Sequence, residues 1–420
     1  MKVLFLPAYF YPEQAASSYL GVNRFDAYAK EGFDMVVYTP VPSRGISAEV
    51  REEYKKKREE KMYSDKMTVH RFSLPAEGKN PIARAFRYFL QVCKHFNRAV
   101  FAKDARSCDL VFLSSTPPIQ GAMGAMIKKC SRKKFIYCVQ DVFPDSLVNT
   151  GLTKKGSILW KIGRVIENFT YRNADKIIVI SNDFKENIMA KGVPEERIEV
   201  IYNWVDQNAV VDVPREENKL FDKYGLDRSK FYVAYSGNIG LSQNMEMLLA
   251  VAEEFLLRQA QEPRLADIQF VLVGEGAALE SVKRTVAEKK LENVHLLPFQ
   301  PYEDISHVFS LGDVSLVISK PGTGAASVPS KTWSIMSASR PVLANFDENE
   351  LKTIIEKHNC GIFTKAGDKE AFKEAILKLY NDRDLCKEYG KNGRKFVMEN
   401  LTREVGTQKY VDVIRSVVKK

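Results

Sequence analysis

Short apolar runs alternate with segments of helical periodicity along most of the chain. Many of these runs are continuously apolar, which is typical of parallel strands that are covered on both faces of a sheet. We expect strands at residues 3–6, 35–38, 68–72, 110–113, 135–139, 177–180 and 198–202, and in the second half at 231–235, 268–273, 294–297, 314–318, 342–344 and 362–364. Because helical segments separate most of them, the pattern predicts an α/β fold of the doubly wound type.

A polar, charged segment at residues 203–219 marks a changeover between two similar halves. We therefore expect an N-terminal Rossmann-like domain at residues 1–205 and a C-terminal one at 206–400, with the cleft between them as the ligand site. Three charged helices without a strand are expected at the end of the chain, at 368–382, 385–400 and 403–420. We expect the last segment, 401–420, to cross back to the N-terminal domain.

The composition is that of a globular protein with an excess of positive charge. The chain has 420 residues, and its formal net charge of +10 favours an anionic partner: nucleic acid, an acidic membrane surface or phosphorylated small molecules. The six cysteines form no Cys-x-x-Cys pair and the five histidines are dispersed, so we expect free thiols and no metal site. The apolar N-terminus is interpreted as a strand rather than a signal peptide, and no run is long enough to predict a membrane span.

The stretch from the strand at 314–318 to the strand at 342–344 has the features of an anion site. A glycine-bearing loop leads from the first strand into a helix that we expect to begin at Ser330, whose hydroxyl would accept from the first free amides. Unpaired amides, the helix dipole and the charge of Lys331 would all point at one place, where a phosphate could bind. The alternative is an ordinary α/β turn that binds nothing.

Four further loops follow predicted strands at the edge where open α/β sheets bind ligands. They are residues 9–18, 140–145, 236–244 and 273–276. In the second loop, Asp141 is a candidate to orient a hydroxyl group or to act electrostatically, with a helix cap as the alternative. The glycines of the last two loops either admit a ligand or only allow a tight turn.

One segment, residues 79–103, has six Lys or Arg and no acidic residue. Its polar positions recur at spacings of three and four and predict one face of a helix, made of Arg84, Arg87, Gln91, Lys94 and Arg98. Such a helix can lie on an anionic bilayer, or its basic face can simply be solvated over a core stripe. Trp160 belongs to a second basic and aromatic patch, with Leu159, Lys161 and Arg164.

Taken in order, these motifs resemble the family 4 retaining glycosyltransferases, in particular the bacterial transferases that build surface polysaccharides on lipid-linked acceptors. The matching pieces are Tyr11-Pro12-Glu13, residues 140–145, 174–181, 237–240 with Gln243, 273–276, 328–331 and 340–343, which span nearly the whole chain. The resemblance implies a GT-B architecture, with two Rossmann-like domains and a cleft between them. It also implies transfer of a sugar from a nucleotide-diphosphate donor, most simply a UDP-sugar, with no metal or cofactor required.

The same resemblance assigns roles to residues of this chain. It implies catalytic roles for Asp141, Asn238 and Lys331. The donor would be bound by Gly237, Gly240, Gln243, Gly274, Glu275, Gly276, Phe299, Pro301, Tyr302, Val328, Ser330 and Glu350. The acceptor would be bound by Gln14, Ser17, Ser18, Arg24 and Gln140.

The chain also departs from the family pattern. Two glutamates of the family pattern are replaced in this chain by Ala326 and Ser334, and the glycine that closes the following turn is replaced by Ser339. The basic residues that commonly bind the phosphates are replaced by Asn238 and Asn244. The charge facing the diphosphate would then rest more heavily on Lys331, and Glu350 is the candidate for holding the ribose.

The leading hypothesis is a cytoplasmic glycosyltransferase, peripheral on the inner face of the cell membrane, that acts on a polyprenyl-diphosphate-linked saccharide. A sugar-nucleotide epimerase on the same scaffold would need more ionisable groups than these loops contain. The replaced glutamates also leave open a non-catalytic protein that binds a nucleotide sugar. A nucleic-acid binder is disfavoured, because the basic residues cluster without the aromatic platform of such proteins.

Overall fold

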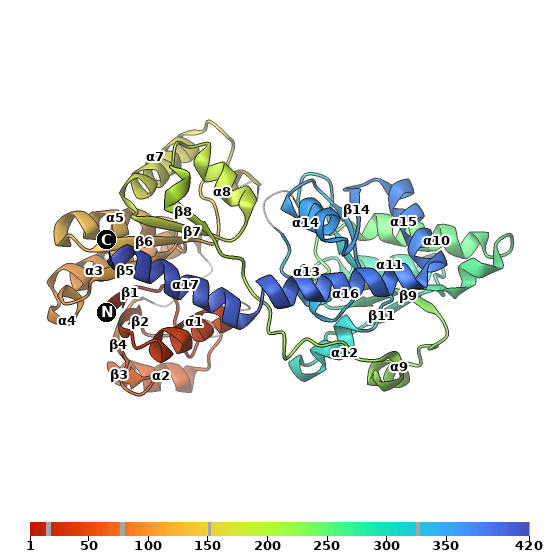
Figure 1. The fold of residues 1–420 in the computed structure, drawn as a ribbon, viewed down its shortest axis with the longest axis horizontal. Coiled ribbons are helices and arrows are strands. Elements are labelled where there is room, and N and C mark those ends of the chain that lie inside the picture. Colours follow the sequence, from red (N-terminus) through yellow and green to blue (C-terminus); the bar gives the residue numbers. More distant parts are fainter. Residues whose placement is uncertain (14–17, 76–79, 150–152, 325–327, 420) are drawn as a thin grey trace. The chain divides into compact units, whose positions relative to one another are not determined.

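The computed structural model describes residues 1–13, 18–75, 80–149, 153–324 and 328–419. The chain divides into two compact units, which Figure 1 colours along the sequence: the first is Met1–Tyr202 with Gly406–Lys420, and the second is Asn203–Val405. The boundary therefore lies slightly before the expected residue 205, and the second unit extends past 400. A backbone hydrogen bond of 3.2 Å from Val205 N–H to Leu401 O joins these two short segments to each other.

The first unit contains an eight-stranded sheet in the order β3-β4-β2-β1-β5-β6-β7-β8 among the described residues. Its strands are β1 (Lys2–Phe5), β2 (Asp34–Pro40), β3 (Glu59–Met62), β4 (Met67–Phe72), β5 (Leu110–Ser114), β6 (Lys134–Val139), β7 (Lys176–Val179) and β8 (Ile198–Val200). All neighbours are parallel except β3, which runs antiparallel to β4 at the edge. Strand β3 is not among the predicted strands, because its residues, Glu-Glu-Lys-Met, show no apolar pattern.

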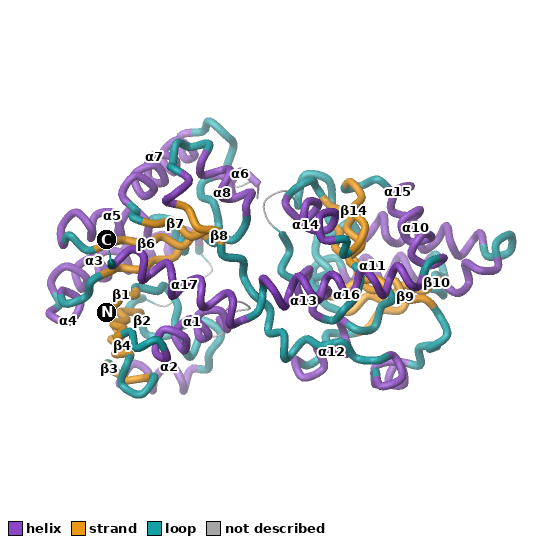
Figure 2. The backbone as a smooth tube through the Cα atoms, viewed as in Figure 1, coloured by secondary structure: helices purple, strands orange, loops and turns teal. Residues whose placement is uncertain are grey.

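Helices cover both faces of this sheet, as Figures 1 and 2 show. They are α1 (Ser18–Lys30), α2 (Ala48–Lys56), α3 (Pro81–Phe101), α4 (Lys103–Arg106), α5 (Gln120–Ser131), α6 (Asp145–Asn149), α7 (Ile158–Asn173), α8 (Asn182–Met189) and the last helix, α17 (Arg403–Val418). Helix α5 packs between α3 and α7. Residues of β5 alternate between the two faces: Val111 and Leu113 join the core cluster shared with α5, whereas Phe112 contacts Tyr410 of α17.

Helix α17 belongs to the first unit because its side chains contact that unit directly. The hydroxyl of Tyr410 lies 3.4 Å from the sulfur of Cys138 on β6. Arg415 forms an ion pair with Glu31, just beyond the end of α1. Thus α1 and α17 share one face of the first sheet.

The second unit contains a six-stranded parallel sheet in the order β11-β10-β9-β12-β13-β14. Its strands are β9 (Phe231–Ser236), β10 (Ile268–Val273), β11 (Val294–Leu297), β12 (Val314–Ile318), β13 (Val342–Phe346) and β14 (Gly361–Lys365). Its helices are α9 (Lys219–Tyr224), α10 (Met245–Arg258), α11 (Leu279–Glu288), α12 (Ile305–Phe309), α13 (Lys331–Ser337), α14 (Glu350–His358), α15 (Lys369–Asn381) and α16 (Arg383–Asn400). The order places the first strand of the unit between the second and the fourth, which is the Rossmann arrangement. The prediction of two doubly wound domains is confirmed.

Candidate functional site

The candidate donor site lies at the switch point of the second sheet, between β9 and β12. These parallel strands pair through Ala234 and Ser315, but their chain connections run to opposite sides. The loops that follow them, residues 237–244 and 319–324, therefore leave the same edge of the sheet in different directions. Open α/β sheets bind their ligands at such a point.

Two glycines, Gly274 and Gly276, let the loop after β10 pack directly on the loop after β9. Gly274 and Gly276 have φ of +150° and +153°, and a Cβ atom would lie 2.0 Å from Gly237 O or 2.3 Å from Ile239 O, respectively. The backbones are joined by hydrogen bonds from Gly237 N–H to Val273 O (3.0 Å) and from Ile239 N–H to Glu275 O (2.8 Å). Loop packing alone therefore explains these glycines, and their contact with a ligand stays a prediction.

Lys331, the first residue of α13, is positioned as an anion-binding group. Its Nζ lies 3.8 Å from the ring centroid of Tyr235, and a Cβ atom on Gly237 would come within 3.2 Å of it. Among the described residues, no carboxylate forms an ion pair with this ammonium group. Burial lowers the pKa of Lys331 to about 7. A half-buried cation that has no protein anion beside it is suited to an anion supplied by a ligand.

The polar side chains of the loop after β9 mainly shape the loop itself. The backbone oxygen of Asn238 accepts a hydrogen bond of 2.6 Å from Tyr235 Oη. Gln243 Oε1 accepts from Gly240 N–H at 3.0 Å. Asn244, which stands where family members commonly have a basic residue, is buried and caps α10 by accepting from Met247 N–H. Asn244 therefore acts as a helix cap.

The loop after β12 is held in place by residues that the sequence analysis did not single out. The Asp347 carboxylate accepts from Gly322 N–H (2.9 Å) and Gly324 N–H (2.8 Å). On the other side, Lys320 N–H donates to Ser242 O at 2.8 Å. Asp347 directly follows β13, but the predicted strand ended at 344, so an acidic residue a few positions beyond it was the signal that could have identified Asp347.

Ser330 differs from the expectation for a capping residue. It already has helical dihedrals, φ −58° and ψ −27°, and its side chain makes no capping hydrogen bond. A capping hydroxyl usually requires an extended backbone, so the predicted role of this hydroxyl was wrong. Helix α13 ends at Ser337, and Ser339, at the usual glycine position, takes a left-handed φ of +55°. Ala326 lies outside the described residues.

Several other predicted donor residues lie at the same edge of the second sheet. Phe299 and Tyr302 follow β11 and are strongly exposed, and Pro301 lies between them. Exposed aromatic rings of this kind are available to stack on a planar base. Glu275 is exposed, Val328 is half-buried, and Glu350 is buried in the first turn of α14. Their contacts with a nucleotide remain predictions.

In the first unit, Asp141 follows β6 at the edge where ligands are expected. The N–H groups of Gln140 and Asp141 both donate to Ser115 Oγ, at 3.0 and 3.2 Å. Desolvation raises the pKa of the Asp141 carboxyl above its ordinary value, and hydrogen bonds from Ser146 and from Val142 N–H oppose the shift. The carboxyl group is thus fixed beside a rigid backbone, and its role toward a substrate stays a prediction.

Asp145, in the same motif, belongs to a structural ion-pair cluster. Lys191 Nζ lies 2.9 Å from Asp145 and 2.7 Å from Glu167, and Arg164 also pairs with Glu167. These side chains come from α6, from α7 and from the turn after α8, so spacing along the sequence could not reveal the cluster. It fixes α7 beside the loop that carries Asp141.

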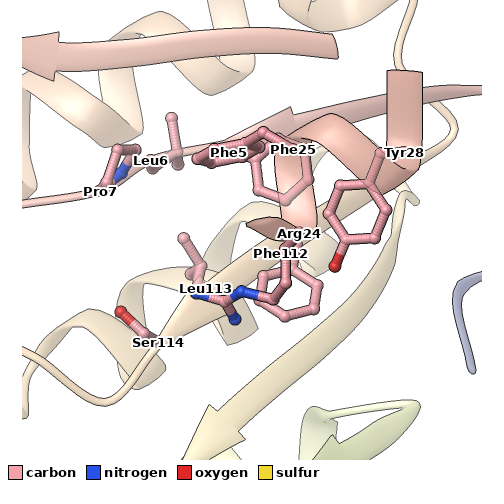
Figure 3. Close-up of a pocket in the computed structure, with 9 residues that line it drawn as sticks. All are labelled: Phe5, Leu6, Pro7, Arg24, Phe25, Tyr28, Phe112, Leu113 and Ser114. Atoms are coloured by element: carbon pink, nitrogen blue, oxygen red, sulfur yellow. The ribbon is translucent and has the colours of Figure 1, made fainter. Parts of the chain in front are cut away.

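Arg24 is an internal residue of the first unit. Its guanidinium lies 4.9 Å from the ring of Tyr410 and 5.8 Å from the ring of Phe112. Figure 3 shows it in a cavity of about 60 Å³ that α1 forms with the ends of β1 and β5. Ser18 begins α1 and donates to Glu13 O at 3.5 Å, whereas Gln14 and Ser17 lie outside the described residues.

The predicted basic face of α3 is only partly on the surface. Arg84, Lys94 and Arg98 are exposed, but Arg87 is 2% exposed and donates to Pro75 O and Ser43 Oγ. The expectation that Arg87 contacts a membrane is therefore wrong, because this guanidinium fastens two loops beneath the helix. Trp160 is half-buried, with its ring against Arg164 and its Nε1 buried, and its contact with a membrane stays a prediction.

In the part of the chain that the structure describes, no three His, Cys, Asp or Glu side chains are placed to hold a metal ion. Nor does any described helix combine the length and apolar character that crossing a bilayer requires.

Comparison with known proteins identifies both halves of the chain. Residues 25–204 match the glycosyl transferase 4-like domain, and residues 216–396 match the glycosyl transferases group 1 family. The probable glycosyltransferase WbjE of Pseudomonas aeruginosa is 27% identical over 351 residues, covering 82% of this chain and 83% of WbjE. The putative colanic acid biosynthesis glycosyl transferase WcaI of Escherichia coli is 27% identical over 219 residues, covering 50% of this chain and 51% of WcaI.

Solved structures support the same fold. Anabaena HepE, crystallised in complex with UDP, superposes with a TM-score of 0.71 at 17% identity, covering 99% of this chain and 100% of HepE. Sucrose-phosphate synthase from Thermosynechococcus elongatus superposes with a TM-score of 0.72 at 16% identity, covering 99% of this chain and 98% of that one. The two family models match consecutive segments of the chain, and each segment lies almost entirely in one of the two Rossmann-like units. The chain therefore belongs to the family 4 glycosyltransferases and has their GT-B fold.

Proposed function

We propose that this enzyme transfers a sugar from a UDP-sugar, with retention of configuration, to a lipid-linked saccharide during synthesis of a bacterial surface polysaccharide (capsule, O-antigen or exopolysaccharide). The observation that carries the proposal is the ammonium group of Lys331, which lies beside Gly237 with no ion-pair partner among the described residues. The names of relatives support the pathway class, since WcaI is named a putative colanic acid biosynthesis glycosyl transferase. HepE has been crystallised with UDP and with UDP-glucose, which supports the donor class.

The chemistry follows from where charge develops. When the bond between the sugar and the diphosphate breaks, negative charge accumulates on the leaving UDP. A preorganised cation stabilises that charge in the transition state more than in the ground state. We assign this role to Lys331, with Asn238 and the backbone at Ser330 as hydrogen-bonding partners of the diphosphate. Because the family's basic residue is the helix cap Asn244 here, Lys331 would supply most of the positive charge.

The remaining assignments follow the loops at the two sheet edges. Phe299 and Tyr302 would stack on the uracil ring, and Glu350 would hold the ribose. In the first unit, the fixed carboxyl of Asp141 would orient the acceptor hydroxyl or the transferred sugar. The enzyme would work at the inner face of the cell membrane, where polyprenyl-diphosphate-linked saccharides are extended.

Thermal unfolding in the presence of UDP, GDP, ADP or NAD tests the donor assignment. A ligand at 100 times its dissociation constant adds about 2.7 kcal/mol to the free energy of unfolding. We expect UDP to raise the midpoint and the Lys331→Ala variant to lose most of the shift. The matched control is Lys320→Ala, which removes a lysine of the loop that precedes α13. The Nζ atom of Lys320 pairs with Glu246 at 3.2 Å. Stabilisation by another nucleotide, or an equal UDP shift in Lys331→Ala, would overturn the assignment.

A further inference from the structure

Helix α7 carries a stripe of exposed apolar side chains. Ile158, Leu159, Ile162 and Val165 are 80%, 51%, 53% and 69% exposed. Their spacing places them along one side of two helical turns. A soluble surface tolerates single exposed apolar residues, but a contiguous stripe of this size marks a contact surface.

The exposed charges of the segment that carries the stripe have one sign. The exposed charged residues of the described segment 153–173 are Lys154, Lys155, Lys161 and Arg172. The only acidic residue of this segment, Glu167, is buried and pairs with Lys191 and Arg164. The apolar stripe is therefore bordered by positive charge, and its natural counterpart is an apolar layer with an anionic rim.

The opposite side of α7 packs on the loop that follows β6. A Cβ atom on Gly163 would lie 2.8 Å from Pro144 Cβ and 2.9 Å from Phe143 Cε1, so only glycine allows this close approach. Arg164 also reaches Asp145, the first residue of α6 directly after this loop, at 3.8 Å. The helix with the exposed stripe is thus fixed to the loop that begins with Gln140 and Asp141.

We propose that α7 lies in the interfacial layer of an anionic bilayer, with its apolar stripe among the acyl chains and its lysines at the headgroups. This inference rests on the proposed lipid-linked acceptor and names the element that brings the enzyme to it. With α7 inserted, the loop of Asp141 lies next to the surface from which a membrane-anchored saccharide emerges.

Self-association through the same stripe fits the charges less well. A symmetric dimer places the same patch of both copies face to face, so Lys154, Lys155 and Lys161 of one copy would approach those of the other. Like charges at an interface are destabilising. The neighbouring helices favour the bilayer as well, because α3 and α5 also expose apolar side chains, namely Phe86, Phe89 and Met126.

Flotation with lipid vesicles tests the proposal on the full chain. The vesicles contain phosphatidylglycerol and phosphatidylethanolamine in one series and phosphatidylcholine alone in the other. We expect binding to the anionic series and at least a tenfold loss of partitioning in Ile162→Glu/Val165→Glu, which corresponds to about 1.4 kcal/mol. The matched control is Leu257→Glu, a change at a 73% exposed apolar residue of α10, and it should bind as the wild type does.

Three further readouts separate the possible outcomes. The double variant should keep the UDP-induced thermal shift, because the donor site lies in the other unit. If UDP does not stabilise the wild type either, the proposed function is refuted instead. The variant should also keep its activity on a short, water-soluble acceptor but lose activity on an acceptor embedded in vesicles. Unchanged vesicle binding in the double variant would overturn the inference. So would a wild-type dimer that the two substitutions dissociate.

Discussion

At the scale of single residues, the protonation of Lys331 should control nucleotide binding. Burial lowers its pKa to about 7, so the free enzyme loses this positive charge as the pH rises through 7. A bound diphosphate favours the ammonium form and raises the pKa again. UDP affinity should therefore be greatest below pH 7 and fall by up to tenfold per pH unit above it, with uptake of close to one proton on binding at pH 8.

Calorimetry at pH 8 in two buffers of different ionisation enthalpy would measure this proton uptake. Lys331→Arg is the informative control, because a guanidinium keeps its charge throughout this range. It should bind UDP without the pH dependence. A wild-type affinity that stays constant from pH 6 to pH 9 would contradict the assigned role of Lys331.

The close packing of the two loops gives a second prediction for single residues. In Gly274→Ala, the new methyl group would meet Gly237 O at 2.0 Å, and the residue would have to keep a φ of +150°. We expect a loss of at least about 2 kcal/mol in the free energy of unfolding, together with weaker UDP binding. In the control Gly32→Ala, φ is +77° and no atom lies within 4 Å, so only the backbone strain of about 1 kcal/mol should appear in urea unfolding.

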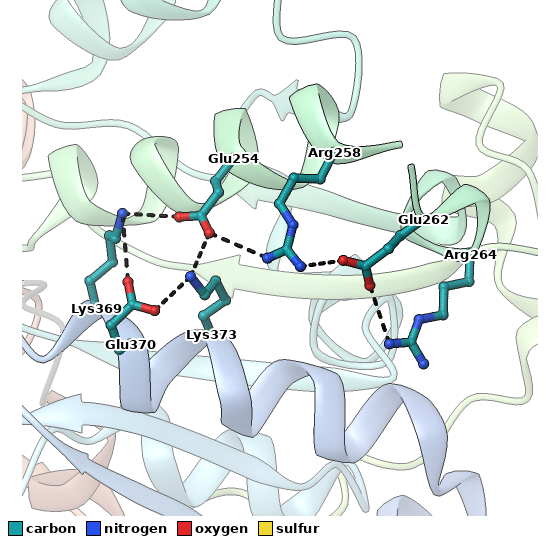
Figure 4. Close-up of polar contacts among 7 residues, drawn as sticks. All are labelled: Glu254, Arg258, Glu262, Arg264, Lys369, Glu370 and Lys373. Atoms are coloured by element: carbon teal, nitrogen blue, oxygen red, sulfur yellow. Dashed lines mark hydrogen bonds and ion pairs between the residues drawn. The ribbon is translucent and has the colours of Figure 1, made fainter. Parts of the chain in front are cut away.

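At the scale of elements, α10 and α15 are joined by the ion-pair network of Figure 4. Glu254 of α10 pairs with Lys373 and Lys369 of α15, and with Arg258 on its own helix. The hydrogen bond from Lys373 is the main reason that the pKa of Glu254 falls to about 2. Because the folded pKa is lowered, this stabilisation is present above the ordinary glutamate pKa of about 4.3 and is lost as the pH falls toward 2.

The Glu254→Gln variant should therefore be less stable than the wild type at pH 7, and the difference should shrink between pH 5 and pH 2. Urea unfolding at several pH values measures it. The control is Glu280→Gln, which breaks an exposed pair with Lys283 and should change stability little at any pH. A difference between Glu254→Gln and the wild type that stays constant with pH would rule out this electrostatic origin.

Local patterns predicted most elements, and long-range contacts decided the rest. Buried parallel strands such as β6 and β9 contain continuous apolar runs, at 135–139 and 231–235, so hydrophobicity alone located them. The edge strand β3 is charged and depends on its pairing with β4. The spacing in α3 correctly grouped Arg87 with Gln91, but both are buried beneath the helix. Periodicity identifies residues that share a face, whereas their burial depends on what packs against that face.

In the candidate site, too, local sequence patterns identified some residues and long-range contacts determined others. Lys331 and the loop glycines could be found from the sequence because their types are unusual in their local setting. Asp347 and the cluster of Asp145 with Lys191 depend on contacts between segments far apart in the chain, which a single sequence does not reveal.

At the scale of the whole molecule, the last segment of the chain completes the first unit. Tyr410 of α17 is 1% exposed, contacts Phe112 and Arg24, and lies 3.4 Å from the sulfur of Cys138. Truncating a buried aromatic side chain leaves a cavity and typically costs about 3 kcal/mol or more. In Tyr410→Ala, we expect this loss in the unfolding of the first unit alone.

The donor site lies in the second unit, so Tyr410→Ala should bind UDP with wild-type affinity while its first unit unfolds at lower urea. Tryptophan fluorescence follows Trp160 in the first unit and Trp204 and Trp333 in the second, so replacing Trp160 by Phe isolates the signal of the second unit. Leu257→Ala, at an exposed residue, should leave both transitions within about 0.5 kcal/mol. If Tyr410→Ala instead abolished UDP binding, the two units would not be independent in stability, and α17 would couple donor binding to the fold of the first unit.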